Sequence, residues 1–328
     1  MVSLLSSSDA RLIKTEKLTR PAITLGISSC LLGEPVRWDG GHKRDSLFAD
    51  ELACFVRFIP VCPEVESGFG VPREPCRLIG DPIAPRFISV HTGKDLTRQL
   101  LQWSRRRVKE LAGEGVGGFI LKDRSPSCGV KQVPVYDERE KRIFSGAGLF
   151  ARVLMAHAPL IPLAEASHLH DPLLRAGFIT RVLVMERWRA TVRDRRSRGA
   201  LVRFHTQHEL VLLAHSPRHC QYLRGLVTRD KAMPLTGIYR EYGRALQEAL
   251  QLKATRAKHV RCLLHAISYF KKNLSPEAKQ KLLAEIAAYR QGQCPRSSPL
   301  ALINHDARLF EQPYLAEQHY LRPHPLEL

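Results

Sequence analysis

Three short apolar runs in the first half of the chain constrain its fold more than any other feature. They span Ala22–Ser28, Val56–Cys62 and Gly118–Lys122, and each has the length and composition of a buried β-strand. Segments with helical periodicity separate them. Other expected elements are an edge strand at 86–91, a last strand at 160–163, and helices at 44–54, 95–112 and 146–157. Strands that alternate with helices predict an α/β domain, with a Rossmann-like parallel sheet covered on both faces.

The second half of the chain has a different pattern. Apolar residues recur there at helical spacing, with little strand alternation. The expected helices cover 179–189, 199–215, 217–229, 238–252, 256–273 and 276–291. Ser275 followed by Pro276 is typical of a helix start. These features predict an all-α C-terminal domain and a boundary between Ala164 and Phe178.

Three regions are therefore expected along the sequence. Residues 1–20 are interpreted as a mobile tail, residues 21–165 as a catalytic domain, and residues 175–328 as a basic helical domain. No apolar run reaches the roughly 18 residues that cross a bilayer. The first 20 residues also lack the apolar core of a secretory signal, so we expect a cytoplasmic protein without a membrane segment.

The positive charge of the chain is unevenly divided. The formal net charge is +19. Residues 1–165 hold 24 Lys and Arg against 19 Asp and Glu, a net of +5, whereas residues 166–328 hold 27 against 13, a net of +14. An excess of this size attracts polyanions, and nucleic acid is the commonest such partner. A merely solvated basic surface and an acidic membrane are the alternatives.

Three of the eight cysteines follow the predicted strands. Cys30 comes directly after the first run, Cys62 ends the second, and Cys128 follows the third. Because the carboxyl ends of parallel strands meet at one edge of a sheet, we expect these thiols to converge. Reduced thiols at such a place indicate either a metal cluster or simple burial. Cys76 is the main competing ligand, although it too is interpreted as incidental. The remaining cysteines are interpreted as packing thiols: Cys54, Cys220, Cys262 and Cys294.

Several short motifs in the first half occur in a telling order. They are Cys30-Leu-Leu-Gly33, Val36-Arg-Trp-Asp-Gly40, Pro60-Val-Cys-Pro-Glu64, Pro72-Arg73, Lys122 and Ser125-Pro-Ser-Cys-Gly129. Together they resemble the TudS-type thiouracil desulfidase family, from about Ala22 to Leu163. Segments 178–188, 198–208 and 215–217 resemble a helical domain that is often fused to this one. The combination is similar to the bacterial tRNA 4-thiouridine desulfidases.

The resemblance implies a cofactor and a set of site residues. The cofactor is a 4Fe–4S cluster held by Cys30, Cys62 and Cys128, with one iron not bound by protein. Glu64 matches the catalytic glutamate of the family, and Ser125 is the best match for its serine. Two further candidates are Lys122, to orient the base or stabilise charge, and Asp39, to contact the base. From the residues alone, the alternative for Glu64 is a surface carboxylate, and the alternative for Ser125 and Asp39 is a turn residue.

Basic residues of the helical half are candidates for binding RNA. Arg187, Arg189 and Arg203 belong to an arginine-rich run that we expect to contact the tRNA backbone, the alternative being a solvated helix face. His205 and His208 lie on one face of the expected helix, together with His215. No carboxylate or cysteine pair completes a zinc site there convincingly. Contact with RNA phosphate, or packing, is expected instead.

The sequence thus predicts a desulfidase that converts 4-thiouridine in tRNA to uridine and releases sulfide. The basic second half favours tRNA, because a small nucleotide needs only a few basic groups. Two alternatives stay open: a desulfidase of free thiouracil or 4-thio-nucleotides, and a non-catalytic iron–sulfur RNA-binding protein or redox sensor. The expected partner is tRNA, with no membrane and no obligate protein partner.

Overall fold

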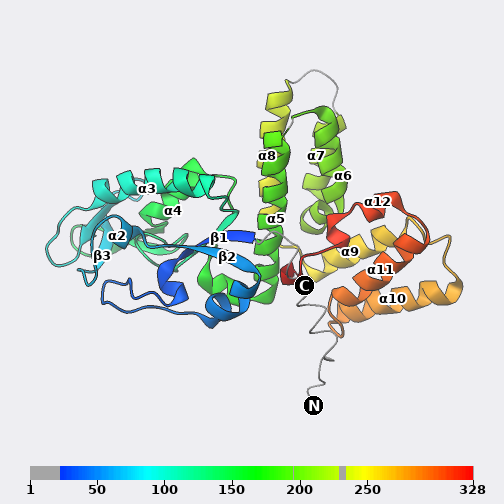
Figure 1. Ribbon diagram of the computed structural model, residues 1–328, viewed down its shortest axis with the longest axis horizontal. Helices are drawn as coiled ribbons and strands as arrows, with labels where there is room; N and C mark the ends of the chain where they lie inside the picture. The colour runs from blue at the N-terminus through cyan, green and yellow to red at the C-terminus, as the bar shows by residue number, and fades with distance from the viewer. Residues whose placement is uncertain (1–22, 195, 229–233, 328) are drawn as a thin grey trace, which may run out of the picture. The chain divides into compact units, whose positions relative to one another are not determined.

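A computed structural model describes residues 23–194, 196–228 and 234–327. The chain divides into two compact units, one ending at His170 and one beginning at Asp171. The first unit is α/β and the second is all-α (Figure 1), which confirms the predicted fold class. The predicted mobile tail at 1–20 lies outside the described residues. No helix in the described part of the chain is long and apolar enough to cross a membrane.

The first unit is built on a four-stranded parallel sheet of order β2-β1-β5-β8. Its strands are β1 (Ile23–Ser28), β2 (Val56–Val61), β5 (Gly118–Leu121) and β8 (Leu163–Glu165). The three predicted apolar runs therefore lie side by side, as expected. Gly26 is required in β1, because a Cβ at this position would lie 2.1 Å from the Phe119 ring of β5. Pro60 has no N–H for a ladder, and it lies in β2, an edge strand where none is needed.

Two helices, α3 (Thr97–Gly113) and α4 (Leu149–His157), lie side by side in this unit (Figure 1). Leu100 and Trp103 of α3 share a buried core with Phe150 of α4 and Phe119 of β5. The Trp103 and Phe150 rings are 5.5 Å apart, and the Phe119 and Phe150 rings 5.6 Å. This core holds the central strands, and hence the loops that follow them, in fixed positions.

A second, mixed sheet of order β4-β3-β6-β7 was not foreseen as a whole. Its strands are β3 (Cys76–Ile79), β4 (Arg86–Ser89), β6 (Val133–Tyr136) and β7 (Arg142–Gly146). Only β4 was expected, and it is indeed an edge strand. The others are four or five residues long, too short for a clear period.

Two other expectations for the first unit need correction. The helix expected at 44–54 is a π-helical turn, η2 (Leu47–Glu51), followed by a 3₁₀ turn, η3 (Leu52–Cys54). The last strand begins at Leu163 rather than Leu160. Pro162, just before it, still contributes a carbonyl that accepts the Phe119 N–H at 2.9 Å. The remaining short elements are η1 (Ser29–Leu32), α2 (Pro63–Glu66) and η4 (Ala166–His170).

All the regular secondary structure among the described residues of the second unit is helical. Its helices are α5 (Pro172–Asp194), α6 (Arg198–His215), α7 (Pro217–Thr228), α8 (Leu235–Gln251), α9 (Arg256–Ile267), α10 (Pro276–Gln291), α11 (Ser297–Leu309) and α12 (Pro313–Ala316), then η5 (His319–Leu321) and η6 (Pro325–Glu327). Helices α5 to α8 form a bundle around Trp188, whose ring stacks on Tyr242 at 4.9 Å. Ser275 accepts the Ala278 N–H and so caps α10, as the sequence predicts. Helix α11 lies in the proline-rich tail, where no helix was assigned.

Candidate active site

The three cysteines predicted as ligands line one cavity of about 270 Å³ in the first unit. Cys30 lies in η1, directly after β1, and Cys62 lies between β2 and α2. Cys128 lies in the loop that follows β5. The parallel register pairs Ser28 with Val61, so β1 and β2 end level with each other. The three cysteines line one cavity because the three segments that carry them leave the same edge of one sheet.

The Cys128 loop is fixed by its own hydrogen bonds and by α4. Ser125 Oγ accepts the N–H groups of Ser127 (3.3 Å) and Cys128 (3.1 Å). The Gly148 N–H donates to Gly129 O at 2.8 Å, and the Phe150 N–H donates to Ser127 O at 3.0 Å. The first N–H groups of α4, which lack partners within their helix, thus bind the ligand loop. Gly148 makes this possible, since a Cβ there would lie 2.5 Å from the Ser127 carbonyl.

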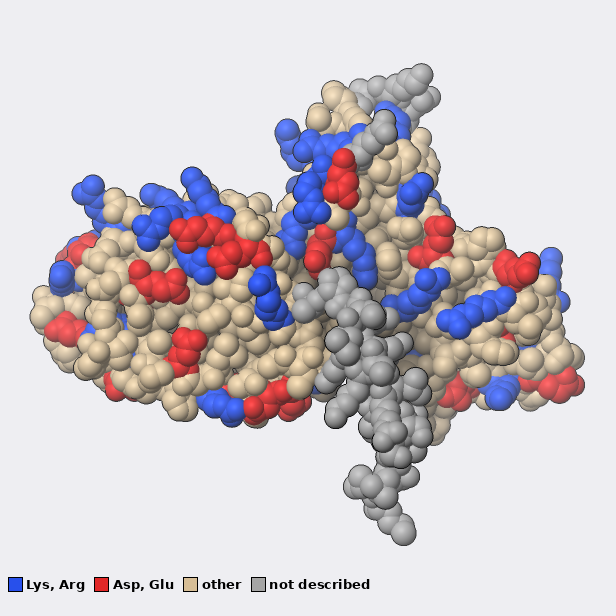
Figure 2. All heavy atoms as spheres, in the orientation of Figure 1, with Lys and Arg blue, Asp and Glu red and all other residues tan. Residues whose placement is uncertain are grey.

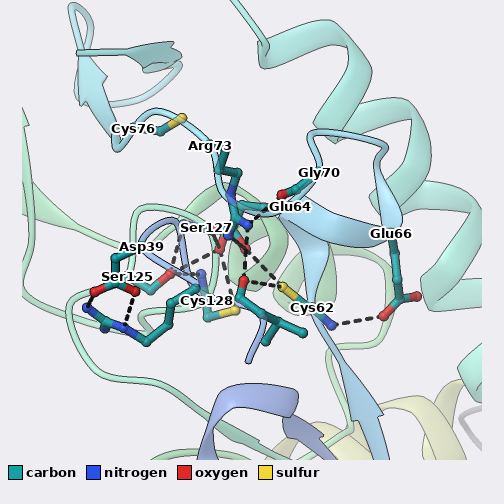
Figure 3. Close-up of polar contacts among 12 residues, drawn as sticks. Asp39, Cys62, Glu64, Glu66, Gly70, Arg73, Cys76, Ser125, Ser127 and Cys128 are labelled. Atoms are coloured by element: carbon teal, nitrogen blue, oxygen red, sulfur yellow. Dashed lines mark hydrogen bonds and ion pairs between the residues drawn. The ribbon is translucent and has the colours of Figure 1, made fainter. Parts of the chain in front are cut away.

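Glu64 points into the centre of this arrangement (Figure 3). Its Oε1 accepts a hydrogen bond of 2.6 Å from Ser127 Oγ. Its Oε2 lies 3.8 Å from the Arg73 guanidinium and 3.7 Å from Cys62 Sγ. The Glu64 and Arg73 side chains are only 13% and 10% exposed, so the ion pair is largely shielded from solvent. The contacts with Ser127 and Arg73 therefore hold the Glu64 carboxylate in one place beside Cys62. Ser127 Oγ also lies 3.5 Å from Cys128 Sγ, so the same hydroxyl connects the carboxylate to a second thiol.

Arg73 ties a second loop to the cavity. The Arg73 guanidinium donates to Val36 O (3.0 Å) and Gly70 O (2.9 Å). The backbone N–H of Arg73 donates to Trp38 O at 2.9 Å. The Val36–Trp38 loop lines the cavity, and the Trp38 side chain is 46% exposed. A large aromatic ring thus remains accessible at the rim.

Burial and the Glu64 carboxylate both disfavour ionised thiols in this cavity. Burial raises the pKa of Cys62 to about 12, with a further contribution from Glu64. The same two causes raise the pKa of Cys30, and that of Cys128 well above its usual value. Without a cation, all three are neutral at physiological pH. Metal binding needs thiolates, so it would release protons here.

Of the other predicted site residues of the first unit, Lys122 and Ser125 line the cavity and Asp39 does not. Lys122 lines the cavity, and its Nζ donates to Asp123 O at 3.1 Å. Ser125 also lines it, although its hydroxyl already accepts two backbone N–H groups. Asp39 does not line the cavity. It pairs with Arg37 at 3.0 Å, and this hydrogen-bonded partner lowers the pKa of Asp39.

Ser127 was missed from the sequence, yet its hydroxyl is the one that binds Glu64. Cys76, interpreted from the sequence as incidental and as the main competing ligand, lines the same cavity, where burial raises its pKa to about 11. Its Sγ lies 3.7 Å from Glu74 O. Loop conformation decides both points, and spacing along the chain does not reveal it.

The candidates in the helical unit divide by exposure. Arg203 is exposed, whereas Arg187 and Arg189 are partly buried, and burial lowers the pKa of Arg189. The expected contact of His205 and His208 with RNA phosphate needs correction, because their side chains are 5% and 1% exposed. His208 stacks on Phe204 at 4.1 Å, and its Nδ1 lies 2.8 Å from Phe204 O. Both histidines belong to the interior of the helical unit.

Comparisons with known proteins match the two units separately. A family model described as 2-thiouracil desulfurase matches residues 25–166, and one described as a protein of unknown function (DUF1722) matches residues 209–325. The uncharacterized protein YbgA of Escherichia coli (strain K12) is 31% identical over 130 residues, 39% of this chain and 77% of that protein. The uncharacterized protein YbbK of Bacillus subtilis (strain 168) is 31% identical over 108 residues, 31% of this chain and 71% of that protein.

A solved structure is also similar to part of the chain. It is described as a [4Fe-4S]-dependent thiouracil desulfidase, TudS, and shares 29% identity over 45% of this chain and 93% of its own, with a TM-score of 0.39. The family match, by contrast, coincides with the α/β unit and its cysteine-lined cavity. The chain therefore belongs to the 2-thiouracil desulfurase family and carries a helical DUF1722 domain after the desulfurase domain.

Proposed function

We propose that the protein is an iron–sulfur-dependent desulfidase that converts 4-thiouridine in tRNA to uridine and releases sulfide. The observation that carries the proposal is the convergence of three free thiols and one held carboxylate in a single cavity. Membership of the 2-thiouracil desulfurase family supports the same chemistry. That the substrate is tRNA is a further part of the proposal, and the support for it is the positive charge of the helical unit.

The donor set fits a 4Fe–4S cluster. Cys30, Cys62 and Cys128 are free thiols on three loops around one cavity, and thiolates are the usual ligands of such clusters. Three ligands leave one iron of four without a protein donor. When bound, the cluster would supply a Lewis acid and a place for the thiocarbonyl sulfur of the substrate. Cys76, at the same cavity, is not needed for this count.

Glu64 is suited to act as the general base. Its Oε2 faces the thiols, while Ser127 and Arg73 hold the carboxylate in position. In the proposed reaction Glu64 accepts a proton from water, whose oxygen bonds to C4 of the base as the C4–sulfur bond breaks. The balance is 4-thiouridine plus water giving uridine plus hydrogen sulfide, so no external electron is needed. General base catalysis of this kind typically contributes about 10² to 10⁴ in rate.

Two further side chains would complete the binding of the base. The exposed Trp38 ring offers a stacking surface at the rim of the cavity, and stacking suits any nucleobase. Lys122 would place a positive charge near the atoms where negative charge develops. Ser125 is proposed to act mainly by shaping the Cys128 loop, since its oxygen accepts two backbone N–H groups.

The helical unit is proposed to hold the tRNA backbone. Figure 2 shows Lys and Arg side chains gathered over the α5–α8 bundle. Among the described residues, the exposed arginines of this region are Arg193, Arg196, Arg203, Arg218, Arg224, Arg240 and Arg244. Residues 166–328 carry a net charge of +14, far more than one nucleotide phosphate requires. Phosphate contacts of this kind give affinity without sequence preference.

The test is a substrate comparison after anaerobic reconstitution with iron and sulfide. Bulk tRNA containing 4-thiouridine, free 4-thiouridine monophosphate and 2-thiouracil are each incubated with the enzyme, and thiocarbonyl absorbance and released sulfide are followed. The Cys30→Ala/Cys62→Ala/Cys128→Ala variant is the control. We expect iron-dependent loss of absorbance with matching sulfide from tRNA. Turnover of the free compounds alone would overturn the tRNA substrate, and a well-formed cluster without any turnover would overturn the enzyme.

A further inference from the structure

Three side chains with metal-binding atoms meet in the helical unit, in a different unit from the cysteine-lined cavity. They are His205 and Glu209 of α6 and Cys220 of α7, and their ligand atoms all lie within 4.8 Å of one another. His205 and Glu209 are one helical turn apart, so they lie on the same face of α6. Cys220 and His205 are buried, and Glu209 is half-buried.

The imidazole of His205 has a nitrogen that nothing else in the structure explains. Its Nε2 is buried in a side chain that is only 5% exposed, and it has no hydrogen-bond partner among the described residues. Its Nδ1 lies 3.1 Å from the Tyr242 hydroxyl. Metal-bound histidines commonly make such a hydrogen bond through the ring nitrogen that does not bind the metal. Burial lowers the pKa of His205 to about 4, so the ring is neutral at physiological pH.

The sulfur of Cys220 lies at the same place. The Cys220 thiol donates to the backbone carbonyl oxygen of Glu209 at 3.8 Å. Burial raises the pKa of Cys220 to about 11. One nitrogen, one oxygen and one sulfur donor make a mixed set of the kind that Zn²⁺ accepts, and three protein ligands leave the fourth tetrahedral position for water.

We propose that His205, Glu209 and Cys220 form a binding site for a divalent metal of the Zn²⁺ class, which ties α6 to α7. The thiol proton leaves as the metal binds, and Nε2 supplies its lone pair directly. The site needs neither the cluster nor the substrate of the first unit. From the sequence alone, no residues completed a zinc site with the histidines of α6. In the proposed site, Glu209 and Cys220 complete the ligand set with His205, and His208 and His215 are not part of it.

Glu209 has two other partners, and one of them competes with a metal. Arg224 forms an ion pair with Oε1, and the Tyr314 hydroxyl donates to Oε2 at 2.9 Å. The Arg224 side chain is 58% exposed, so it can withdraw into solvent when a cation takes its place. Tyr314 can stay as an outer partner of the carboxylate. Removal of the Arg224 charge should therefore tighten metal binding, whereas a purely structural ion pair predicts no such gain.

The test is a titration with Co²⁺ as the spectroscopic probe for Zn²⁺. It is done on the full chain with Cys30, Cys62 and Cys128 replaced by alanine, because these thiols would bind the metal themselves. Far-ultraviolet circular dichroism checks that each variant is folded. We expect one equivalent of Co²⁺ to give a thiolate-to-metal charge-transfer band, and Zn²⁺ to displace it. Failure of this titration leaves the proposed desulfidase untouched, since the background lacks the ligands of its cluster.

Matched variants separate a site from packing. Cys220→Ser and His205→Ala should abolish the charge-transfer band, whereas Cys262→Ser and His208→Ala, which change buried residues of the same unit, should keep it. Arg224→Ala should tighten Co²⁺ binding by about ten-fold, as expected from the loss of one nearby like charge. The proposal is overturned if the parent shows no band, if Cys220→Ser keeps it, or if Arg224→Ala binds no more tightly.

Discussion

Each unit buries a cysteine, Cys62 in the first and Cys262 in the second, and of these two only Cys62 is proposed as a ligand. Burial raises the pKa of both thiols to about 12, so neither burial nor acidity separates them. Cys62 follows a strand and lines a cavity with two other thiols and a carboxylate. Cys262 lies within α9, with its sulfur 3.6 Å from the Leu210 carbonyl. The presence of other donors around the sulfur, rather than its burial, is what we take to mark a proposed ligand, both for Cys62 and for Cys220.

The strongest way to break this comparison is to remove each thiol in turn. Cys62→Ala should prevent cluster formation completely, since a ligand is lost. Cys262→Ala should leave iron content and visible absorbance after reconstitution unchanged and cost only about 1–2 kcal/mol of stability through the lost packing. Equal iron content in the two variants would contradict the distinction.

The carboxylates of the two units offer the next test. Glu64 and Glu209 are similarly shielded, at 13% and 14% side-chain exposure, and each pairs with an arginine. Glu64→Gln should keep the cluster spectrum and lower turnover of 4-thiouridine by about 10² to 10⁴, the usual contribution of a general base. Glu209→Gln should keep turnover within about two-fold, as is usual away from the chemistry. Near-normal turnover in Glu64→Gln would rule out its role as the base.

Acid should affect the helical unit first. Burial lowers the pKa of His215 to about 4 and that of His259 to about 3, with Lys258 and Arg296 adding positive charge nearby. Because the unfolded chain binds these protons from about pH 6.5, stability is full above that pH and is lost as pH falls toward the folded values. Each histidine should cost roughly 1–3 kcal/mol between pH 7 and pH 4.

Hydrogen exchange with mass spectrometry measures both units in one sample. Amides of α6 and α9 should lose protection between pH 7 and pH 4, after correction for the intrinsic rates, before those of β1 and β5 do. His259→Gln, which cannot take up a proton, should reduce the difference. Simultaneous loss of protection in both units would show that these histidines do not set the acid limit.

A smaller effect is expected at the hydroxyl that holds Glu64. Ser127→Ala removes the hydrogen bond to Oε1 and should lower kcat by about ten-fold while KM is unchanged, as is expected for loss of one positioning contact. Ser104→Ala is the matched control, because Ser104 is a fully buried serine whose hydroxyl has no partner in the described part of the chain. A rise in KM with kcat unchanged would instead place Ser127 in substrate binding.

The smallest expected effect is at the charged surface. Arg203→Ala, on α6, should weaken tRNA binding by about two- to three-fold and reduce its salt dependence by about one ion. Arg139→Ala, in the turn between β6 and β7, should leave both unchanged. Equal losses in the two variants would indicate that binding depends on total charge rather than on the helical unit.

The sequence was sufficient for the three strands built on short apolar runs. Strands β1 and β5 are almost entirely buried, and the edge strand β2 keeps enough apolar residues, despite exposed Arg57 and Pro60, for its ends to be predictable. The position of the three cysteines followed. Strand β7 is largely exposed, with no apolar period to reveal it. In α6 a helical pattern correctly grouped His205 with His208 but did not show which face is buried, because apolar side chains occur on most sides of this helix.

The site shows the same limit at the level of single atoms. Ser125 and Ser127 occur in one motif, and either hydroxyl is a reasonable partner for a carboxylate. The backbone of the loop turns Ser127 toward Glu64 and Ser125 toward the N–H groups of the loop. That choice depends on contacts with α4, some twenty residues further along the chain, which no local pattern encodes.

The approach of α4 to this loop has a consequence for how natural variants of the protein are judged. Gly148 does not line the cavity and is not itself a proposed ligand, so a survey of the liganding positions alone would score its replacement as harmless. Yet any side chain there would press on the Ser127 carbonyl, next to Cys128. An inherited change at Gly148 should therefore be classed with loss of a cofactor ligand rather than with tolerated surface variation.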